Sequence, residues 1–255
     1  MIIEPVHALD HVHKLFNGST KRADRAQIGQ FLTPAAIAQC MSSMFETGPE
    51  EVRLLDPGAG AGMLLAACVE TLVSQKNRPL SIEVVAYETD STILPYLHET
   101  MKRTQSLCVS KGIVFKGIIK PEDFISAAIT ETKESLFTVP GVRFTHVILN
   151  PPYKKINSRT VMSKMLYSSD IEVANFYAAF VWLSMLLLER RGQMVAITPR
   201  SFRSRNLSLS PPPRVLILRK HTPCPSHTIG LFIPMIQICL FIWALLMPIV
   251  ARQSE

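Results

Sequence analysis

The sequence predicts an α/β fold in which helices cover both faces of a mostly parallel sheet. Short β-branched segments alternate with helical segments from about residue 24 to Phe202. Helices of this length between strands close only as right-handed crossovers, so ligands should bind at the carboxyl ends of the strands. The 255 residues are enough for one such domain with an appendage. We therefore divide the chain into an N-terminal helical segment (1–23), a main domain (24–202) and an atypical tail (203–255).

The first half of the main domain shows a helix, a strand and a crossover helix. Thr33 followed by Pro34 is typical of a helix start, and apolar residues then recur at helical spacing. The apolar run at 51–56 predicts the first strand. Residues 63–74, which follow three closely spaced glycines, predict the first crossover helix.

The second half of the main domain predicts more strands, with helices between most of them. The clearest helix covers residues 171–190. The four further strands are expected at 82–88, 112–117, 142–149 and 192–198.

Composition limits the classes of function. The net charge of +7 permits binding to phosphate-rich partners without requiring it. Five scattered cysteines without a C-x-x-C pair argue against disulfides and structural zinc, and they fit a reducing cytoplasm. His7 and His11 share a helical spacing, but no carboxylate or cysteine completes a metal site, so we predict no metal. The first residues do not resemble a signal peptide, so we expect a cytoplasmic protein.

The tail differs in composition from the domain before it. No Asp or Glu occurs from Arg190 to Ser254, although acids normally cap helices and solvate the surface of an α/β domain. A segment rich in Ser, Pro and Arg is followed by 22 uncharged residues at 229–250. That run is long enough to span a bilayer, but its internal Pro234, Gln237 and Pro248 make a membrane segment the less favoured interpretation.

A glycine-rich turn follows the first strand in the stretch "LLDPGAGAG". Glycines there let the backbone approach a ligand closely, and the next helix offers its N-terminal N–H groups to negative charge. The spacing G-x-G-x-G and the preceding acid favour S-adenosylmethionine over a dinucleotide. The residues assigned to this cofactor turn are Asp56, Pro57, Gly58, Gly60 and Gly62.

Two acids that follow the next strands are further candidates for cofactor binding. Glu88 ends the second strand, where a carboxylate can accept both hydroxyls of an adenosine ribose, and Asp90 is the neighbouring candidate. Asp123 follows the third strand and is either a helix N-terminal acid or an acceptor for the amine of the cofactor's adenine. Phe124 would pack near that adenine ring.

The stretch "NPPY" at the end of the fourth predicted strand indicates methyl transfer to an aromatic amine. Such an amine is a poor nucleophile because its lone pair is delocalised into the ring. Two acceptors on its N–H bonds favour the reactive form, and the Asn150 side-chain oxygen and the Pro151 carbonyl can supply them. Pro151 and Pro152 fix the backbone, and Tyr153 offers a flat face on which a base can stack.

These motifs together carry a family resemblance. "GQFLTPAAIAQCM", "LLDPGAGAG", "AYETD", "EDF" and "NPPY" occur in the order seen in the gamma-class adenine-N6 DNA methyltransferases of bacterial restriction–modification systems. The resemblance covers residues 24–202 and implies a Rossmann-like S-adenosylmethionine-dependent methyltransferase fold. It also implies that Phe31, Thr33 and Pro34 lie at the cofactor site, and that Phe176 and Tyr177 support the pocket for the target base.

The resemblance implies site-specific methylation of an adenine flipped out of double-stranded DNA, with a restriction endonuclease as a possible functional partner. "NPPY" alone also occurs in protein-glutamine and ribosomal RNA methyltransferases, so these activities are alternatives. A third alternative is a non-catalytic remnant that binds S-adenosylmethionine. Members of the family continue with further strands and a target-recognition domain. Residues 203–255 resemble neither, so we expect no target-recognition domain in the tail and infer a truncation or frame shift after Phe202.

Overall fold

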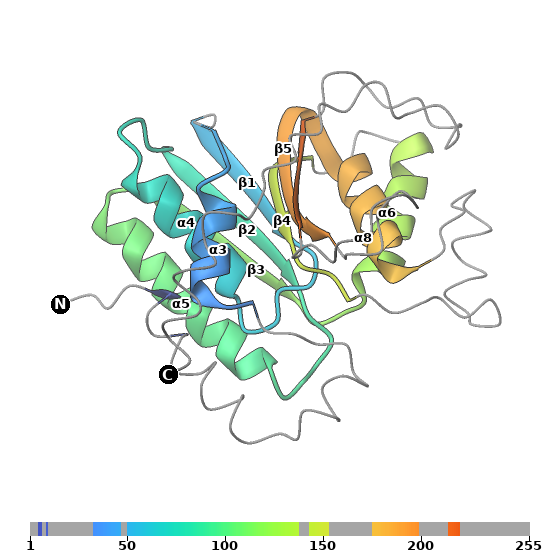
Figure 1. The fold of residues 1–255 in the computed structure, drawn as a ribbon, viewed down its shortest axis with the longest axis horizontal. Coiled ribbons are helices and arrows are strands. Elements are labelled where there is room, and N and C mark those ends of the chain that lie inside the picture. The colour runs from blue at the N-terminus through green and yellow to red at the C-terminus, as the bar shows by residue number, and fades with distance from the viewer. Residues whose placement is uncertain are drawn as a thin grey trace, which may run out of the picture.

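The computed structural model describes a six-stranded sheet and the helices that pack against it (Figure 1). It describes Pro5, Val6, Leu9 and residues 33–46, 50–137, 143–152, 175–198 and 214–219. The strands in chain order are β1 (Glu51–Asp56), β2 (Ser81–Tyr87), β3 (Val114–Lys120), β4 (Phe144–Leu149), β5 (Leu188–Thr198) and β6 (Arg214–Arg219).

The strands lie in the order β3-β2-β1-β4-β5-β6. Strands β1 to β5 are parallel to their neighbours, and only β6 runs antiparallel to β5. In this order β1 lies between β2 and β4, with Leu54 paired to Val84 on one side and to His146 on the other. The carboxyl ends of β1, β2 and β4 therefore meet at the same edge of the sheet.

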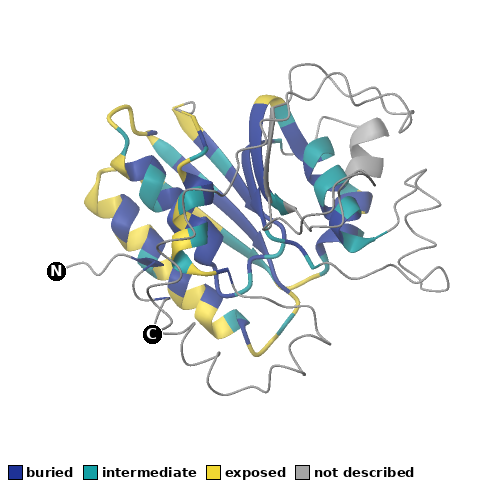
Figure 2. Ribbon diagram, in the orientation of Figure 1, coloured by how far each residue is buried: buried dark blue, intermediate teal, exposed yellow. Residues whose placement is uncertain are grey.

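Helices cover both faces of the sheet, as predicted (Figure 1). One face packs against α3 (Ala35–Ser42), α4 (Met63–Ser74) and α5 (Leu94–Ser110), and the other packs against α6 (Phe124–Phe137) and α8 (Phe176–Leu187). Each face has its own apolar core, and the central strands between them are buried (Figure 2). Because both faces of β4 are covered, all six of its residues are buried.

The α/β fold and its five parallel strands confirm the sequence prediction, and the bounds of β1 and α4 agree with it. The helix predicted at 171–190 is shorter, because α8 ends at Leu187 and β5 begins at Leu188. Leu, Glu and Arg are good helix formers, which is why the segment "LLLERR" was expected to continue the helix. Pairing of this segment with β4 overrides its helix preference. The pairing is irregular, because its register shifts between Phe144 and His146 and Arg191 has a positive φ of 69°.

The sheet also extends past Phe202, where the sequence analysis placed only an atypical tail. Arg214–Arg219 forms β6 and pairs with Gln193–Thr198 of β5. This segment holds a four-residue apolar run after three prolines, a pattern compatible with a strand, but the sequence analysis assigned it to the tail because of the Ser, Pro and Arg around it.

Two segments treated in the sequence analysis lie wholly or mostly outside the described residues. In the segment 1–23, Pro5, Val6 and Leu9 are helical, and Val6 and Leu9 are buried in the core on the α4 face. The Val6 amide donates to Oε1 of Glu70 on α4 at 2.7 Å. The apolar run at 229–250 is not described, and no helix in the part of the chain that is described is long and apolar enough to cross a bilayer.

Candidate active site

The residues predicted to carry the chemistry meet at the carboxyl edge of the sheet. Asp56 is the last residue of β1, Glu88 directly follows β2, and Asn150 directly follows β4. Because β2, β1 and β4 are adjacent and parallel, these three positions come from neighbouring strand ends. Sequence segments almost a hundred residues apart thus contribute to one site.

The glycine turn after β1 is held against the end of β2. The Ala59 amide donates to the Tyr87 carbonyl at 2.9 Å, and the Gly60 amide donates to Oε2 of Glu88 at 2.8 Å. Gly60 has a φ of 53°, in the left-handed region where glycine costs least. The amides of Ala59 and Gly60 thus fix the shape of the turn.

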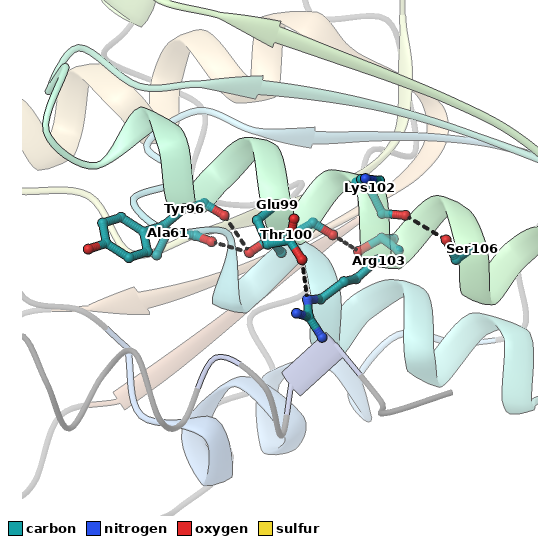
Figure 3. A network of polar contacts seen from close by, with 8 residues as sticks. Ala61, Tyr96, Glu99, Thr100, Lys102, Arg103 and Ser106 are labelled. Atoms are coloured by element: carbon teal, nitrogen blue, oxygen red, sulfur yellow. Dashed lines mark hydrogen bonds and ion pairs between the residues drawn. The ribbon is translucent and has the colours of Figure 1, made fainter. Parts of the chain in front are cut away.

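Gly62 ends the turn and lets helix α5 approach α4 closely. Its φ is 90°, and a Cβ there would lie 2.9 Å from Cγ2 of Thr100 and 3.0 Å from Cδ1 of Leu97. The Thr100 hydroxyl reaches the Ala61 carbonyl at 2.7 Å and the Tyr96 carbonyl at 2.9 Å (Figure 3). The side of the turn that faces α5 is therefore closed by packing and by a buried hydrogen bond.

Glu88 is buried and already accepts three backbone hydrogen bonds. Oε1 accepts from the amides of Thr89 and Asp90, each at 2.8 Å, and Oε2 accepts from Gly60. An ionised carboxylate has about four acceptor positions, so about one remains for a ligand. The prediction that Glu88 binds the ribose hydroxyls of the cofactor stays a prediction.

Asp56 is fully buried at the centre of the site. The amides of Gly58 and Leu65 face its carboxylate and lower its pKa, but neither oxygen has a hydrogen-bond partner. Burial outweighs those amides and, with the nearby charge of Glu88, raises the pKa of Asp56 to about 7. A buried carboxylate without a partner fits a site that receives a cation, and S-adenosylmethionine carries positive charge.

Asp123 and Phe124 both serve structural roles at the start of α6. Oδ1 of Asp123 accepts from the Ser126 amide at 2.8 Å, which is the N-terminal role weighed in the sequence analysis. Phe124 is only 2% exposed and packs edge-on against Tyr87 with ring centroids 5.2 Å apart. Whether Asp123 also accepts from an adenine amine stays a prediction.

The sequence analysis missed Phe180 on α8. Its ring packs on Phe124 at 5.2 Å between centroids, and its Cε1 lies 3.6 Å from where a Cβ of Gly58 would stand. Phe180 thus supports the glycine turn from the α6–α8 face of the sheet. The available signal was its position one helical turn after Phe176 in a helix that follows the catalytic loop.

At the end of β4, Asn150 lies against the segment that precedes α3. Nδ2 of Asn150 donates to Oγ1 of Thr33 at 3.1 Å. Thr33 is buried, whereas Pro34, the N-cap of α3, is exposed. The structure therefore joins a residue that the resemblance assigned to the cofactor with the predicted catalytic amide.

The remaining predicted site residues are distributed as follows. Pro57 and Pro151 are buried, Pro152 is half-buried, Tyr177 is buried and Phe176 is half-buried. Phe31 and Tyr153 lie outside the described residues, so their roles stay predictions. Within the described ranges, no three His, Cys, Asp or Glu side chains come together as a metal site.

Comparison with known proteins supports the same class. Residues 88–211 match the family model described as Eco57I restriction-modification methylase. The chain is 37% identical over 182 residues to the type II methyltransferase M.BsuBI of Bacillus subtilis, and 31% identical over 194 residues to M.PstI of Providencia stuartii. These alignments cover 70% and 76% of this chain, but only 35% and 37% of the relatives.

Two solved structures share the fold. A Listeria monocytogenes protein provisionally assigned as a class I S-adenosylmethionine-dependent methyltransferase superposes with a TM-score of 0.56 at 14% identity, over 79% of this chain and 55% of the other. A modification subunit provisionally assigned to a type I restriction enzyme of Vibrio vulnificus gives a TM-score of 0.51 at 19% identity, over 77% and 40%.

The sheet, the glycine turn and the strand-end acids define the Rossmann-like fold of S-adenosylmethionine-dependent methyltransferases. Within that class, the chain is similar to the restriction-modification methyltransferases, of which it spans about a third of the length. S-adenosylmethionine is the cofactor that this class implies.

Proposed function

We propose that the chain is the catalytic part of a DNA methyltransferase that transfers the methyl group of S-adenosylmethionine to N6 of an adenine flipped out of the duplex. One observation supports this most directly. Asn150 and Pro151 follow β4 at the same sheet edge as Asp56 and the glycine turn of the adjacent β1. An amide oxygen and a carbonyl suited to bind an aromatic amine thus lie one strand away from the proposed cofactor site.

The residues around the turn fit the cofactor. Asp56 offers a buried, unpartnered carboxylate to a cation, and Glu88 keeps about one acceptor position for a ribose hydroxyl. When bound, S-adenosylmethionine supplies a methyl group activated by a sulfonium centre, which can be displaced in line by a nucleophile.

In this proposal Asn150 and Pro151 act on the target amine. The Asn150 Oδ1 and the Pro151 carbonyl accept the two N–H bonds, which favours the form whose lone pair points at the methyl group. Tyr153 supplies a stacking face for the flipped base. Rate then comes from positioning and electrostatics, without a covalent enzyme intermediate.

DNA is the proposed substrate because the chain is similar to restriction-modification methyltransferases and carries a net charge of +7. Positive charge favours association with the phosphate backbone, although it does not select DNA over RNA. Protein glutamine and ribosomal RNA remain the competing substrates because they share the "NPPY" chemistry.

The proposal is tested with the full chain and S-adenosylmethionine labelled in the methyl group. Duplex DNA, an oligonucleotide with unpaired adenines, ribosomal RNA and a release-factor protein are offered separately. We expect label in the oligonucleotide with unpaired adenines, recovered as N6-methyladenine after digestion, and little or none in duplex DNA, because extrusion of a paired base must be offset by recognition contacts. Label only in RNA or protein would replace the proposal. Cofactor binding measured by calorimetry, with no transfer to any of these substrates, would favour a non-catalytic remnant.

A further inference from the structure

We propose that Glu88 is a positioning residue that fixes the shape of the glycine turn before S-adenosylmethionine binds. Its carboxylate ties the Gly60 amide, and with it the backbone of the turn, to the end of β2. This inference rests on the proposed function, because it takes the turn and Glu88 as parts of the cofactor site. It gives Glu88 a role beyond the contact with the ribose hydroxyls that the sequence predicts.

The hydrogen bonds of Glu88 divide between two segments of the chain. Oε1 accepts from the amides of Thr89 and Asp90, the two residues that directly follow, each at 2.8 Å. Oε2 accepts from the Gly60 amide, 28 positions earlier in the chain, also at 2.8 Å. Glu88 itself is only 8% exposed. One oxygen therefore holds the carboxylate on its own strand end, and the other holds the turn.

Gly60 is the part of the turn where such a contact matters most. On one side the Ala59 amide is already bound to the Tyr87 carbonyl, and on the other Gly62 packs against α5. Between these fixed points Gly60 has no side chain and a φ of 53°, so its backbone has wide conformational freedom. The bond to Glu88 restricts that freedom in the free protein. A site ordered in advance loses less entropy when a ligand binds, and this raises its affinity.

The arrangement needs a carboxylate and not merely a polar side chain. All three partners are backbone N–H groups, which can only donate, so both ends of the side chain must accept. A glutamine has nearly the same shape, but one of its ends is an NH2 group that donates. In Glu88→Gln the amide oxygen should stay with the two donors of Thr89 and Asp90. The NH2 group then opposes the Gly60 amide, and the contact with the turn is lost.

The first experiment measures the exchange of backbone amide hydrogens in the cofactor-free full chain by ¹⁵N spectra. In Glu88→Gln we expect the Gly60 amide to exchange at least about tenfold faster than in the wild-type protein, because a donor replaces its acceptor. The Ala59 amide, which donates to a backbone carbonyl of β2, should change by less than about twofold. Glu83→Gln removes a carboxylate from the same strand and is the matched control, which should leave both amides unchanged.

Three results of this experiment would overturn the proposal. Exchange of the Gly60 amide at the rate of an unstructured glycine in the wild-type protein would do so without any variant. Protection of Gly60 that survives Glu88→Gln in a folded protein would show that other contacts hold the turn. Equal loss of protection at Ala59 and Gly60 would show that Glu88 stabilises the whole strand end and does not position the turn.

The second experiment separates positioning from direct contact with the ribose. Calorimetry measures the binding of S-adenosylhomocysteine and of its analogue that lacks both ribose hydroxyls. We expect Glu88→Gln to weaken binding of the analogue by about tenfold, because the turn is no longer ordered in advance. Equal affinity of wild type and variant for the analogue would restrict Glu88 to the hydroxyls and overturn the inference.

The same measurements distinguish this inference from the proposed function. A wild-type chain that binds neither ligand would refute both. Binding of both ligands as expected, without methyl transfer to any substrate, would refute the proposed function alone and leave the role of Glu88 in place.

Discussion

Asn150 has one observed contact and one proposed role at the end of β4. Its nitrogen is held by Thr33, and its oxygen is the proposed acceptor for the target amine. Replacing it with alanine removes both functions at the end of β4 but leaves the glycine turn after β1 in place. The residue should therefore matter for transfer much more than for cofactor binding.

We expect Asn150→Ala to reduce methyl transfer by about 100-fold or more, because loss of one preorganised acceptor has effects of that size. Binding of S-adenosylmethionine, measured by calorimetry, should change by less than about threefold. The exposed Asn77→Ala provides a matched control. Transfer near the wild-type rate in Asn150→Ala would refute the proposed mechanism.

Asp56 should make stability depend on pH. Its folded pKa is about 7 and its ordinary value is 3.8, so the folded state holds the proton more tightly than the unfolded chain. The stabilisation is fully present below about pH 3.8 and is lost as the pH rises to 7. Asp56→Asn should abolish this loss and stabilise the protein at pH 8 by on the order of 4 kcal/mol relative to wild type.

Urea unfolding of both proteins between pH 4 and 8 measures this difference. His146 changes stability in the opposite direction, because burial lowers its pKa to about 4, but it is present in both proteins and cancels. A constant difference across this range would contradict the assignment. The same variant should weaken binding of S-adenosylmethionine, since it removes the carboxylate proposed to face the cation.

At the scale of elements, Gly62 joins the glycine turn to α4 and lies in close contact with Leu97 and Thr100 of α5. Gly62→Ala would place a methyl group 2.9 Å from Thr100 in a backbone with φ of 90°. We expect a loss of about 2–4 kcal/mol in the free energy of unfolding, from backbone strain and overpacking together. Gly112→Ala is a matched control with a similar positive φ and open space around it, and it should cost only about 1 kcal/mol. Equal losses would show that the close approach of α5 is unimportant.

The elements also show what the sequence could predict. β1 and α4 were found because their apolar runs are bounded by a glycine turn, so local pattern and tertiary role agree. The start of β5 was missed because "LLLERR" favours a helix, and only pairing with β4 makes it a strand. The strand-end acids were found from their positions, but the three amides bound by Glu88 and the Thr33–Asn150 contact depend on segments distant in sequence.

For the whole molecule, the sixth strand changes where a shortened chain must end to keep the sheet complete. A chain that ends at Phe202 would lose β6 and expose the edge of β5, where Met194, Val195 and Ala196 are fully buried. We expect it to melt about 5 °C or more below a chain that ends at Lys220, or to aggregate through the open edge. Calorimetric scans with light scattering measure both effects. Equal melting temperatures without aggregation would show that β6 contributes nothing to the stability of the sheet.

The central place of β1 has a consequence for how the protein is made. Its pairing with β2 needs only the segment up to Tyr87, and β3 then pairs with β2 by Lys120, but the other neighbour of β1, β4, begins at Phe144. At ribosomal rates of about 5–20 residues per second, β4 follows β1 by roughly 4 to 18 seconds. During that interval the nascent chain carries Leu54 and Leu55 beside an unpaired backbone edge. Strand β4 completes the proposed active site. Its late synthesis also means that β4 ends the period in which the open edge of β1 can pair with nascent chains on neighbouring ribosomes.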